Sequence, residues 1–272
     1  MNGIVININP VIFQVGHVEL RWYSLAVLAA ALAVFFIAVR GAKQKGIPSE
    51  VIYNLTPWVL LGGVVGARLF HVLDHLSYYL ANPIQIIQLQ QGGLAIWGAL
   101  IGGGLAIAIY ARAQRISLGL LADILVPAIL VGQIIGRFGC IVNGDAAGGA
   151  TTLPWGFIYT NPASSIAPGL LGVPTHPYPV YEMLWNAATL LLVHILKGRF
   201  NKNGMLFAVY LALYALGRLL LTTVRYESVL FWGLQEAQVL AIAAWALAGA
   251  IILKLNRRRN LIPEREIKDE HL

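Results

Sequence analysis

The sequence predicts an all-α integral membrane protein with seven transmembrane helices. The chain has 272 residues, of which 58% are hydrophobic and 11% are charged, and its mean hydropathy is +0.71. Several apolar runs exceed the roughly 18 residues that indicate a membrane-spanning helix. The single Cys allows no internal disulfide framework, and the sequence has no Cys or His spacing typical of a zinc site.

The apolar runs place the seven spans at residues 22–39, 51–73, 94–111, 118–141, 178–196, 204–224 and 236–254. We expect one polytopic membrane domain over residues 1–260, followed by a charged cytoplasmic tail over residues 261–272. No internal repeat is evident in the sequence, which argues against a duplicated transporter architecture.

Lysines and arginines predict the orientation of the spans. Of the 19 such residues, 14 follow the first, third, fifth and seventh spans: Arg40, Lys43, Lys45, Arg112, Arg115, Lys197, Arg199, Lys202, Lys254, Arg257, Arg258, Arg259, Arg265 and Lys268. The positive-inside rule assigns this side and the C-terminus to the cytoplasm, and it places the N-terminus outside. The basic C-terminal region is expected to contact lipid headgroups, and no nucleic-acid partner is expected.

The segment before the first span is expected on the outer side. Residues 1–20 lack the basic start of a signal peptide, and Pro10–Leu20 is expected to lie on the outer surface. Tyr23 stands beside Trp22 at the start of the span. It is therefore either a residue of the aromatic belt at the interface or part of a site.

Glycines indicate close helix packing in the second, third and fourth spans. Pairs of glycines four residues apart, a spacing that lets helices approach closely, are Gly62 and Gly66, Gly98 and Gly102, and Gly132 and Gly136. Residues 77–92 contain no Lys or Arg and predict an interfacial or re-entrant segment on the outer side. Residues 143–177 predict a periplasmic or extracellular loop domain that acts as a lid or a binding surface.

The five remaining basic residues are all arginines within spans or at their outer ends: Arg21, Arg68, Arg137, Arg218 and Arg225. An ionised side chain at the centre of a membrane helix costs at least about 2.5–3.5 kcal/mol on insertion scales, so each such residue marks a candidate site.

Three of these arginines are predicted to lie at a similar depth. Arg68, Arg137 and Arg218 stand 17, 19 and 14 residues after the predicted span starts at residues 51, 118 and 204. At about 1.5 Å per residue, all three fall in the outer half of a hydrocarbon core about 30 Å thick. They would repel one another unless they share an anion, and a lipid phosphate suits the guanidinium fork. Alternatively, each arginine snorkels outward or pairs with Glu182, Asp145 or a carbonyl.

The run Gly136-Arg137-Phe138-Gly139-Cys140-Ile141-Val142-Asn143-Gly144-Asp145 resembles the signature of the prolipoprotein diacylglyceryl transferase family. Supporting matches are Asn9–Phe13, Arg21–Leu25, Gly66–Arg68, His176–Pro177 with Tyr181–Glu182, Tyr214, Gly217–Arg218 and Arg225. The resemblance extends over nearly the whole chain, and the seven-span, N-outside layout of the family agrees with the charge distribution.

The resemblance implies an enzyme of the bacterial cytoplasmic membrane. Such an enzyme transfers the diacylglyceryl group from phosphatidylglycerol to the lipobox cysteine thiol of a prolipoprotein, forms a thioether and releases glycerol 1-phosphate. This is the first step of lipoprotein maturation. The implied partners are phosphatidylglycerol, prolipoprotein signal peptides with a lipobox cysteine, and membrane lipids; neither a metal nor an organic cofactor is implied.

The resemblance also implies roles for individual residues. Arg137 and Arg218 match the essential arginines of the family and are assigned to phosphate binding and leaving-group stabilisation. Further substrate-binding candidates are Arg68, Tyr23, Asn143, Gly144, Tyr214, Glu182 and Arg225. We interpret Cys140 as a packing residue, because the acceptor thiol comes from the substrate.

The chain departs from the family pattern at Trp97, where many members carry a His proposed as the base, and at Thr222, where many carry Glu. An indole cannot accept a proton. The candidates for the proton acceptor are therefore His71, His176, the substrate phosphate or water. Two functional alternatives are an outward-facing anion or lipid transporter and a weakened family copy that lacks the usual His.

Overall fold

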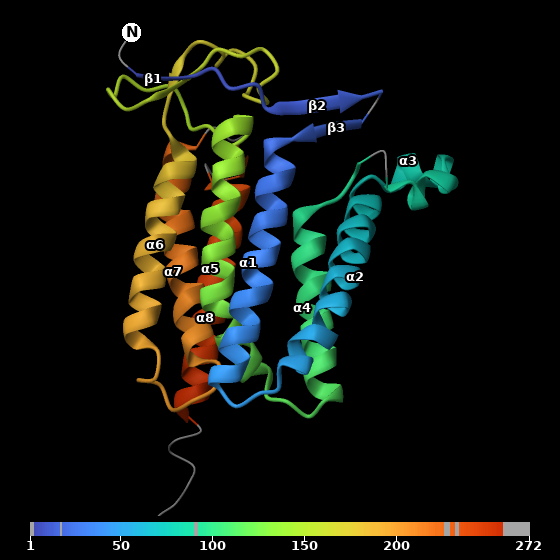
Figure 1. The fold of residues 1–272 in the computed structure, drawn as a ribbon, viewed down its shortest axis with the longest axis vertical. Coiled ribbons are helices and arrows are strands. Elements are labelled where there is room, and N and C mark those ends of the chain that lie inside the picture. Colours follow the sequence, from blue (N-terminus) through green and yellow to red (C-terminus); the bar gives the residue numbers. More distant parts are fainter. Residues whose placement is uncertain (1–2, 17, 90–91, 226–228, 232–233, 258–272) are drawn as a thin grey trace, which may run out of the picture. The chain divides into compact units, whose positions relative to one another are not determined.

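The computed structural model describes residues 3–16, 18–89, 92–225, 229–231 and 234–257. Within these residues, seven helices are long and apolar enough to cross a membrane, which confirms the predicted fold class (Figure 1). The orientation of the helices in the membrane stays a prediction. The predicted tail at 261–272 lies outside the described residues.

The seven helices are α1 (Trp22–Gln44), α2 (Ser49–Asp74), α4 (Ile96–Ala113), α5 (Leu118–Asn143), α6 (Tyr178–Leu196), α7 (Met205–Leu221) and α8 (Glu236–Arg257). The largest difference from the predicted spans is at the end of α1, which continues to Gln44 instead of ending at residue 39. Lys and Arg are good helix formers, so Arg40 and Lys43 continue the helix beyond its apolar run. A short 3-10 turn, η3 (Thr222–Val224), completes the span that α7 begins.

The chain divides into two compact units. Unit 1 contains the segments Met1–Val34 and Leu125–Leu272, and unit 2 contains Phe35–Ile124. The division falls inside α1 and α5, so each of these helices contributes to both units.

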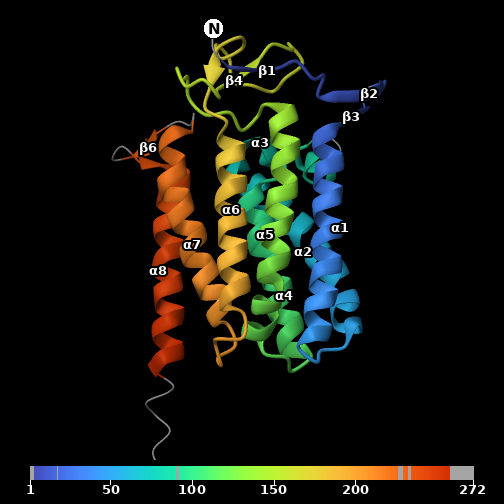
Figure 2. The same cartoon turned by 60° about the vertical axis from the view of Figure 1, so that its left-hand side comes forward.

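In unit 1, α7 packs beside both α6 and α8 (Figure 2). A buried apolar cluster joins α5, α6 and α7, and its members are Val126, Leu130, Val193, Leu206 and Tyr210. Lipid tails are as apolar as these side chains, so close van der Waals packing rather than the hydrophobic effect favours this contact.

Short strands cover the end of unit 1 at which α5 ends and α6 begins (Figure 2). They are β1 (Ile4–Ile6), β4 (Phe157–Tyr159) and β5 (Pro174–Thr175), in the order β1-β4-β5. β1 pairs in parallel with β4, and β4 pairs antiparallel with β5. The predicted loop domain is thus partly sheet. Strands this short produce too little alternation to be recognised in the sequence.

Two hairpins stand beside helix starts in unit 1. β2 (Val11–Val15) pairs with β3 (Val18–Arg21) directly before α1, within the segment expected on the outer surface. β6 (Val229–Phe231) pairs with β7 (Leu234–Gln235) directly before α8.

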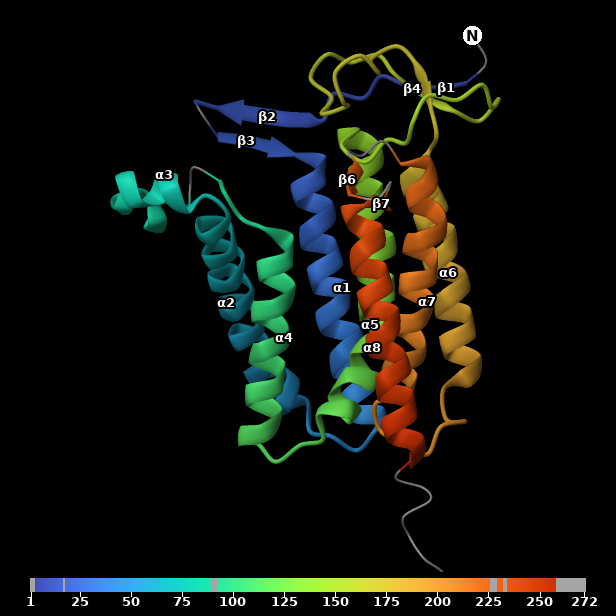
Figure 3. The same ribbon diagram turned by 180° about the vertical axis from the view of Figure 1, so that it is seen from behind.

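In unit 2, α2 and α4 lie side by side because glycines face each other across their interface (Figure 3). A Cβ added to Gly98 would lie 2.1 Å from the carbonyl oxygen of Gly66, and one added to Gly102 would lie 2.1 Å from that of Gly62. The two small-xxx-small pairs therefore allow the close approach that their spacing predicted. In the third pair, Gly132 faces Val34 of α1, whereas nothing lies within 4 Å of a Cβ at Gly136.

The segment between α2 and α4 begins with two short helices, α3 (Leu76–Ala81) and η1 (Pro83–Ile87). Three of its apolar side chains are strongly exposed: Leu80 at 73%, Ile84 at 73% and Ile87 at 80%. Such a surface suits the predicted interfacial position, which stays a prediction.

We expect Gly98→Ala to destabilise the folded protein, because its new methyl group would overlap the Gly66 backbone and separate α2 from α4. Overpacking of this kind costs about 1–3 kcal/mol. Gly104→Ala is the matched control on the same helix, since nothing lies within 4 Å of a Cβ at that position. Thermal unfolding in detergent should show a lower midpoint for Gly98→Ala alone; equal midpoints for the two variants would contradict the packing.

Candidate active site

A buried carboxylate on α6 lies between two arginines from neighbouring helices of unit 1. Glu182 is 7% exposed, and its Oε1 atom lies 3.1 Å from Nη1 of Arg218 on α7. Its other oxygen, Oε2, contacts Nη2 of Arg137 on α5. Glu182 therefore joins three helices at one level. These three residues are termed the Arg–Glu–Arg cluster below.

Two tyrosines hold Arg218 in a fixed orientation. The hydroxyl of the fully buried Tyr178 accepts a hydrogen bond of 3.0 Å from Arg218 Nη1. The hydroxyl of Tyr214 accepts one of 3.2 Å from Arg218 Nε. Tyr178 precedes Glu182 by four residues, and Tyr214 precedes Arg218 by four. Residues four apart share a helix face, so α6 and α7 each present one tyrosine and one charged group to the site.

A third arginine, Arg225, stacks on Tyr178. Its Cζ atom lies 5.2 Å from the centroid of the Tyr178 ring, a geometry that attracts the cation to the ring face. The position of Arg225 is set by its backbone, which forms a bridge to Gly148 in the loop between α5 and α6. The adjacent hydrogen bond from Gly149 N to Val224 O, at 2.9 Å, strengthens this connection.

A glycine allows α6 and α7 to meet at this level. A Cβ added to Gly217 would lie 2.3 Å from Nε1 of Trp185, whose indole N–H donates a hydrogen bond of 3.0 Å to the carbonyl of Leu213. A larger residue at 217 would displace this ring. The Gly-Arg sequence of α7 therefore helps to bring Arg218 within reach of Glu182.

Arg137 lies near the end of α5, beside the single cysteine. Its Nη1 atom is 3.5 Å from the sulfur of Cys140, which is buried. On another face of the same turn, a Cβ added to Gly139 would lie 2.9 Å from Ala26 Cβ and 3.1 Å from Tyr23 Cα. Tyr23 of α1 thus lies against the turn of α5 that follows Arg137, and its side chain remains partly exposed.

α5 ends in a polar turn that leads into the loop between α5 and α6. Gly144 has a φ of +83° and donates a hydrogen bond of 2.8 Å to the carbonyl of Cys140, as in a left-handed helix cap. The side chain of Asn143 accepts from Arg21 Nη1 at 3.1 Å and donates to Asp145 at 2.9 Å. These contacts place Asn143 and Gly144 in the helix-ending turn and connect that turn to the start of α1.

Tyr159 of β4 fixes the loop above the same turn. It is 1% exposed, and its hydroxyl donates a hydrogen bond of 3.0 Å to the carbonyl of Ile141. Burial, with a smaller effect of the Asp145 carboxylate, raises the pKa of Tyr159 above its ordinary value. The hydroxyl therefore keeps its proton and remains a donor at neutral pH.

Arg68, in unit 2, directs its guanidinium to backbone carbonyls. The five carbonyls that it contacts belong to Gln85, Ile86, Gln88, Gly92 and Gly93. A guanidinium has five N–H groups, and Arg68 is 7% exposed. Of the partners considered from the sequence, which were a lipid phosphate, the carboxylates of Glu182 and Asp145, and a carbonyl, the structure shows carbonyls at Arg68. This residue orders the segment that leads to α4.

The two candidate histidines lie in different units. His71 belongs to unit 2, where its ring centroid is 4.4 Å from that of His75. His176 belongs to unit 1, and its Nδ1 atom is 3.4 Å from the hydroxyl of Tyr181. Its backbone carbonyl accepts a hydrogen bond of 2.7 Å from the N–H of Tyr178. Trp97 stands in the first turn of α4, in unit 2.

The charges of the site in unit 1 do not balance. Within the Arg–Glu–Arg cluster, Arg137 and Arg218 carry two positive charges and Glu182 carries one negative charge, which leaves one positive charge. Unbalanced cations in a low-dielectric setting favour the binding of an anion. Across the described ranges, no group of three or more His, Cys, Asp or Glu side chains is arranged to hold a metal ion.

Tyr178 was not among the predicted site residues, and the contact of Arg21 with Asn143 was not predicted. Tyr178 could have been found, because its four-residue spacing from Glu182 on a predicted helix places both side chains on one face. The contact between Arg21 and Asn143 joins residues 122 positions apart, so no local pattern indicated it.

Comparison with known proteins identifies relatives along most of the chain. The family model described as prolipoprotein diacylglyceryl transferase matches residues 10–254. The phosphatidylglycerol–prolipoprotein diacylglyceryl transferase of Thermosynechococcus vestitus is 34% identical over 254 residues, which cover 92% of this chain and 94% of the relative. Proteins of the same name from Nostoc sp. and Geobacter sulfurreducens are 35% identical over 263 residues and 37% identical over 221 residues.

The match to the Nostoc protein covers 94% of this chain and 92% of that relative. The match to the Geobacter protein covers 79% of this chain and 81% of that relative. The family match begins before α1 and ends within α8, so it includes the first six long helices, most of α8 and every member of the Arg–Glu–Arg cluster. The chain therefore belongs to the prolipoprotein diacylglyceryl transferase family.

Proposed function

We propose that this protein transfers the diacylglyceryl group of phosphatidylglycerol to the lipobox cysteine of prolipoproteins, in the bacterial cytoplasmic membrane. As a member of its family, it is a multi-pass membrane transferase of lipoprotein maturation. Its relatives from Thermosynechococcus vestitus and Nostoc sp. are named for phosphatidylglycerol and prolipoprotein, which supports the choice of substrates. The Arg–Glu–Arg cluster is the observation that carries the proposal to the level of residues.

The phosphate of phosphatidylglycerol suits the charge of this site. A phosphodiester carries one negative charge, and the Arg–Glu–Arg cluster leaves one positive charge, because Glu182 offsets one of its two arginines. Guanidinium groups bind phosphate oxygens through paired N–H donors. In the proposal, Arg137 and Arg218 bind the lipid phosphate, and Arg225 adds to the field that attracts it.

The proposed reaction is a substitution at the glyceryl carbon that carries the phosphate. The thiolate sulfur of the prolipoprotein attacks this carbon, so a C–S bond forms while the C–O bond to phosphate breaks. The electron pair of the broken bond remains on the phosphate oxygen, and glycerol 1-phosphate leaves. The proton of the thiol passes to an acceptor. If the acceptor is the phosphate of the substrate, the released glycerol 1-phosphate carries one negative charge; if it is another group, the product carries two.

The residues around Arg218 and Arg137 would stabilise the charge that develops on the leaving group. Tyr178, Tyr214 and Glu182 hold the Arg218 guanidinium before substrate arrives, and Glu182 also holds Arg137. Donors that are already oriented lose little energy to reorganisation in the transition state, and a single such donor typically contributes a factor of about 10²–10³ in rate. Glu182 thus acts as a positioning residue that also reduces repulsion between the two cations.

The proton acceptor in this proposal is His176, His71, water or an oxygen of the substrate phosphate. His176 belongs to the same unit as the Arg–Glu–Arg cluster, and its backbone is hydrogen-bonded to that of Tyr178. Trp97 cannot take this role, because an indole nitrogen is a donor only.

Transfer of labelled diacylglyceryl from phosphatidylglycerol to a lipobox peptide tests the proposed function directly. The purified protein should label the peptide on its cysteine and release glycerol 1-phosphate in equal amount. No transfer, in a detergent that supports another member of the family, would overturn the proposal. Anion flux in protein-containing liposomes, without any transfer, would favour the transporter alternative.

We expect Arg137→Ala to lower kcat by about 10²–10³-fold, because one oriented donor to the leaving phosphate is lost. Arg137→Lys should recover only part of the rate, since an ammonium cannot bind phosphate bidentately. Cys140→Ala is the neighbouring control and should remain within a few-fold of wild type. The peptide-labelling assay measures all three, and full activity of Arg137→Lys would contradict bidentate binding.

We expect Tyr178→Phe to lower kcat by about fivefold. The ring remains for Arg225 to stack upon, but the hydrogen bond that orients Arg218 is lost, at a cost of about 1 kcal/mol. Tyr210→Phe is a matched control, since its buried hydroxyl bonds Gln133 rather than an arginine of the site. If both variants lose activity to the same extent, the hydroxyl of Tyr178 has no particular role.

We expect Trp97→His to change the transfer rate by less than tenfold, because the proposed acceptors do not include residue 97. The variant and wild type should also support equal growth of a bacterium depleted of its own enzyme. A gain of tenfold or more in Trp97→His would show that this chain lacks a base that an imidazole can supply.

A further inference from the structure

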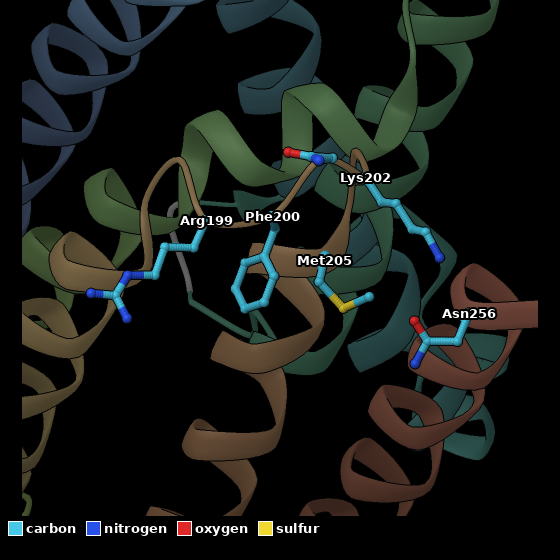
Figure 4. A pocket seen from close by; sticks show the side chains of 6 residues that line it. Arg199, Phe200, Lys202, Met205 and Asn256 are labelled. Atoms are coloured by element: carbon cyan, nitrogen blue, oxygen red, sulfur yellow. The ribbon is translucent and has the colours of Figure 1, made fainter. Parts of the chain in front are cut away.

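A pocket with a mixed polar and apolar lining lies at the end of unit 1 where α6 ends and α7 begins (Figure 4). Its volume is about 430 Å³, and it is lined by Arg199, Phe200, Asn201, Lys202, Met205 and Asn256. Most of these residues belong to the loop between α6 and α7, whereas Asn256 comes from the last turn of α8. Met205 and Arg218 are 13 residues apart on α7, so at about 1.5 Å per residue roughly 20 Å separates this cavity from the Arg–Glu–Arg cluster.

The two stretches of chain that line the cavity are rich in basic residues. The stretches 196–205 and 250–257 contain Lys197, Arg199, Lys202, Lys254 and Arg257, and neither contains Asp or Glu. The positive-inside rule assigns this end of the helices to the cytoplasmic side of the membrane. The cavity therefore lies at the level expected for lipid headgroups of the cytoplasmic leaflet.

The lining has one polar side and one apolar side. Lys202 donates a hydrogen bond from Nζ to the carbonyl of Leu255, which holds its ammonium group beside the end of α8. An ammonium group has three N–H donors, and this bond uses one. Figure 4 shows Phe200 and Met205 together, with the head groups of Lys202 and Asn256 beyond Met205. Arg199 extends from the opposite side of Phe200 and directs its guanidinium outward.

We propose that this cavity binds the phosphate-bearing headgroup of an anionic phospholipid. Lys202 and Asn256 would contact the phosphate region, while Phe200 and Met205 would contact the glycerol backbone and the first methylenes of the chains. Basic pockets between transmembrane helices on the cytoplasmic side are suited to such headgroups. The apolar side and the position at the helix ends favour a lipid over a soluble phosphate.

The bound lipid would connect the α6–α7 loop to α8. Lys202 already makes this connection to the Leu255 carbonyl, so a headgroup at the same place would reinforce it. A ligand that binds only the folded state raises the stability of that state in proportion to the logarithm of its concentration. The expected effect is therefore on stability, with the chemistry about 20 Å away unchanged.

Lys202→Gln tests the proposal in the full-length protein. Protein in phosphatidylcholine nanodiscs is prepared with increasing fractions of dioleoyl phosphatidic acid, and the thermal unfolding midpoint is followed. Phosphatidic acid should raise the midpoint of wild type, and Lys202→Gln should lose at least half of this increase. Lys254→Gln is the matched control, because Lys254 is exposed on α8 but does not line the cavity; it should keep the full increase.

A second variant keeps Lys202 and fills the cavity. Asn256→Trp changes an exposed residue, so the fold is expected to tolerate it, and it should also lose the response to phosphatidic acid. Transfer activity of folded Lys202→Gln should remain within about twofold of wild type. Equal midpoint increases in wild type, Lys202→Gln and Asn256→Trp would overturn the proposal. Stabilisation by inorganic phosphate that equals the effect of the lipid would overturn the assignment to a lipid.

Discussion

The carboxylate of Glu182 is the group on which the arrangement of the site depends. Two arginines on neighbouring helices would repel each other at membrane depth, yet Arg137 and Arg218 both contact the same buried carboxylate. Neighbouring groups reinforce this pairing: Tyr178 and Tyr214 orient Arg218, and Gly217 leaves room for Trp185 between α6 and α7. Breaking such a buried pair leaves an uncompensated charge, which costs about 3–5 kcal/mol. The remaining positive charge makes the site attractive to a lipid phosphate.

Arginines at a similar predicted depth have different partners. Arg68 saturates its guanidinium with carbonyls and orders a segment of unit 2, whereas Arg137 and Arg218 share a carboxylate in unit 1. Depth along a helix is set by residue count, but the partner is set by which groups other segments bring nearby. The same cation can therefore stabilise irregular backbone in one place and present an anion site in another.

The sequence allowed the seven helices to be predicted almost completely, because long apolar runs with few charged residues are typical of membrane-spanning helices. The strands β4 and β5 were not predicted, since two or three residues cannot establish an alternation. Arg137, Arg218 and Glu182 were recognised as candidates from charge and from family resemblance. The contacts of Arg21 with Asn143 and of Arg225 with Tyr178 were not, because they depend on how distant segments meet in the folded chain.

Lipid affinity shows whether the Arg–Glu–Arg cluster binds the phosphate of the lipid substrate, as we propose. The dissociation constants of phosphatidylglycerol and of diacylglycerol with the same acyl chains can be compared in wild type and in Arg218→Ala. We expect Arg218→Ala to weaken phosphatidylglycerol binding by tenfold or more and to leave diacylglycerol binding unchanged, because only the first lipid carries a phosphate. Equal weakening of both lipids, or of neither, would contradict the proposal.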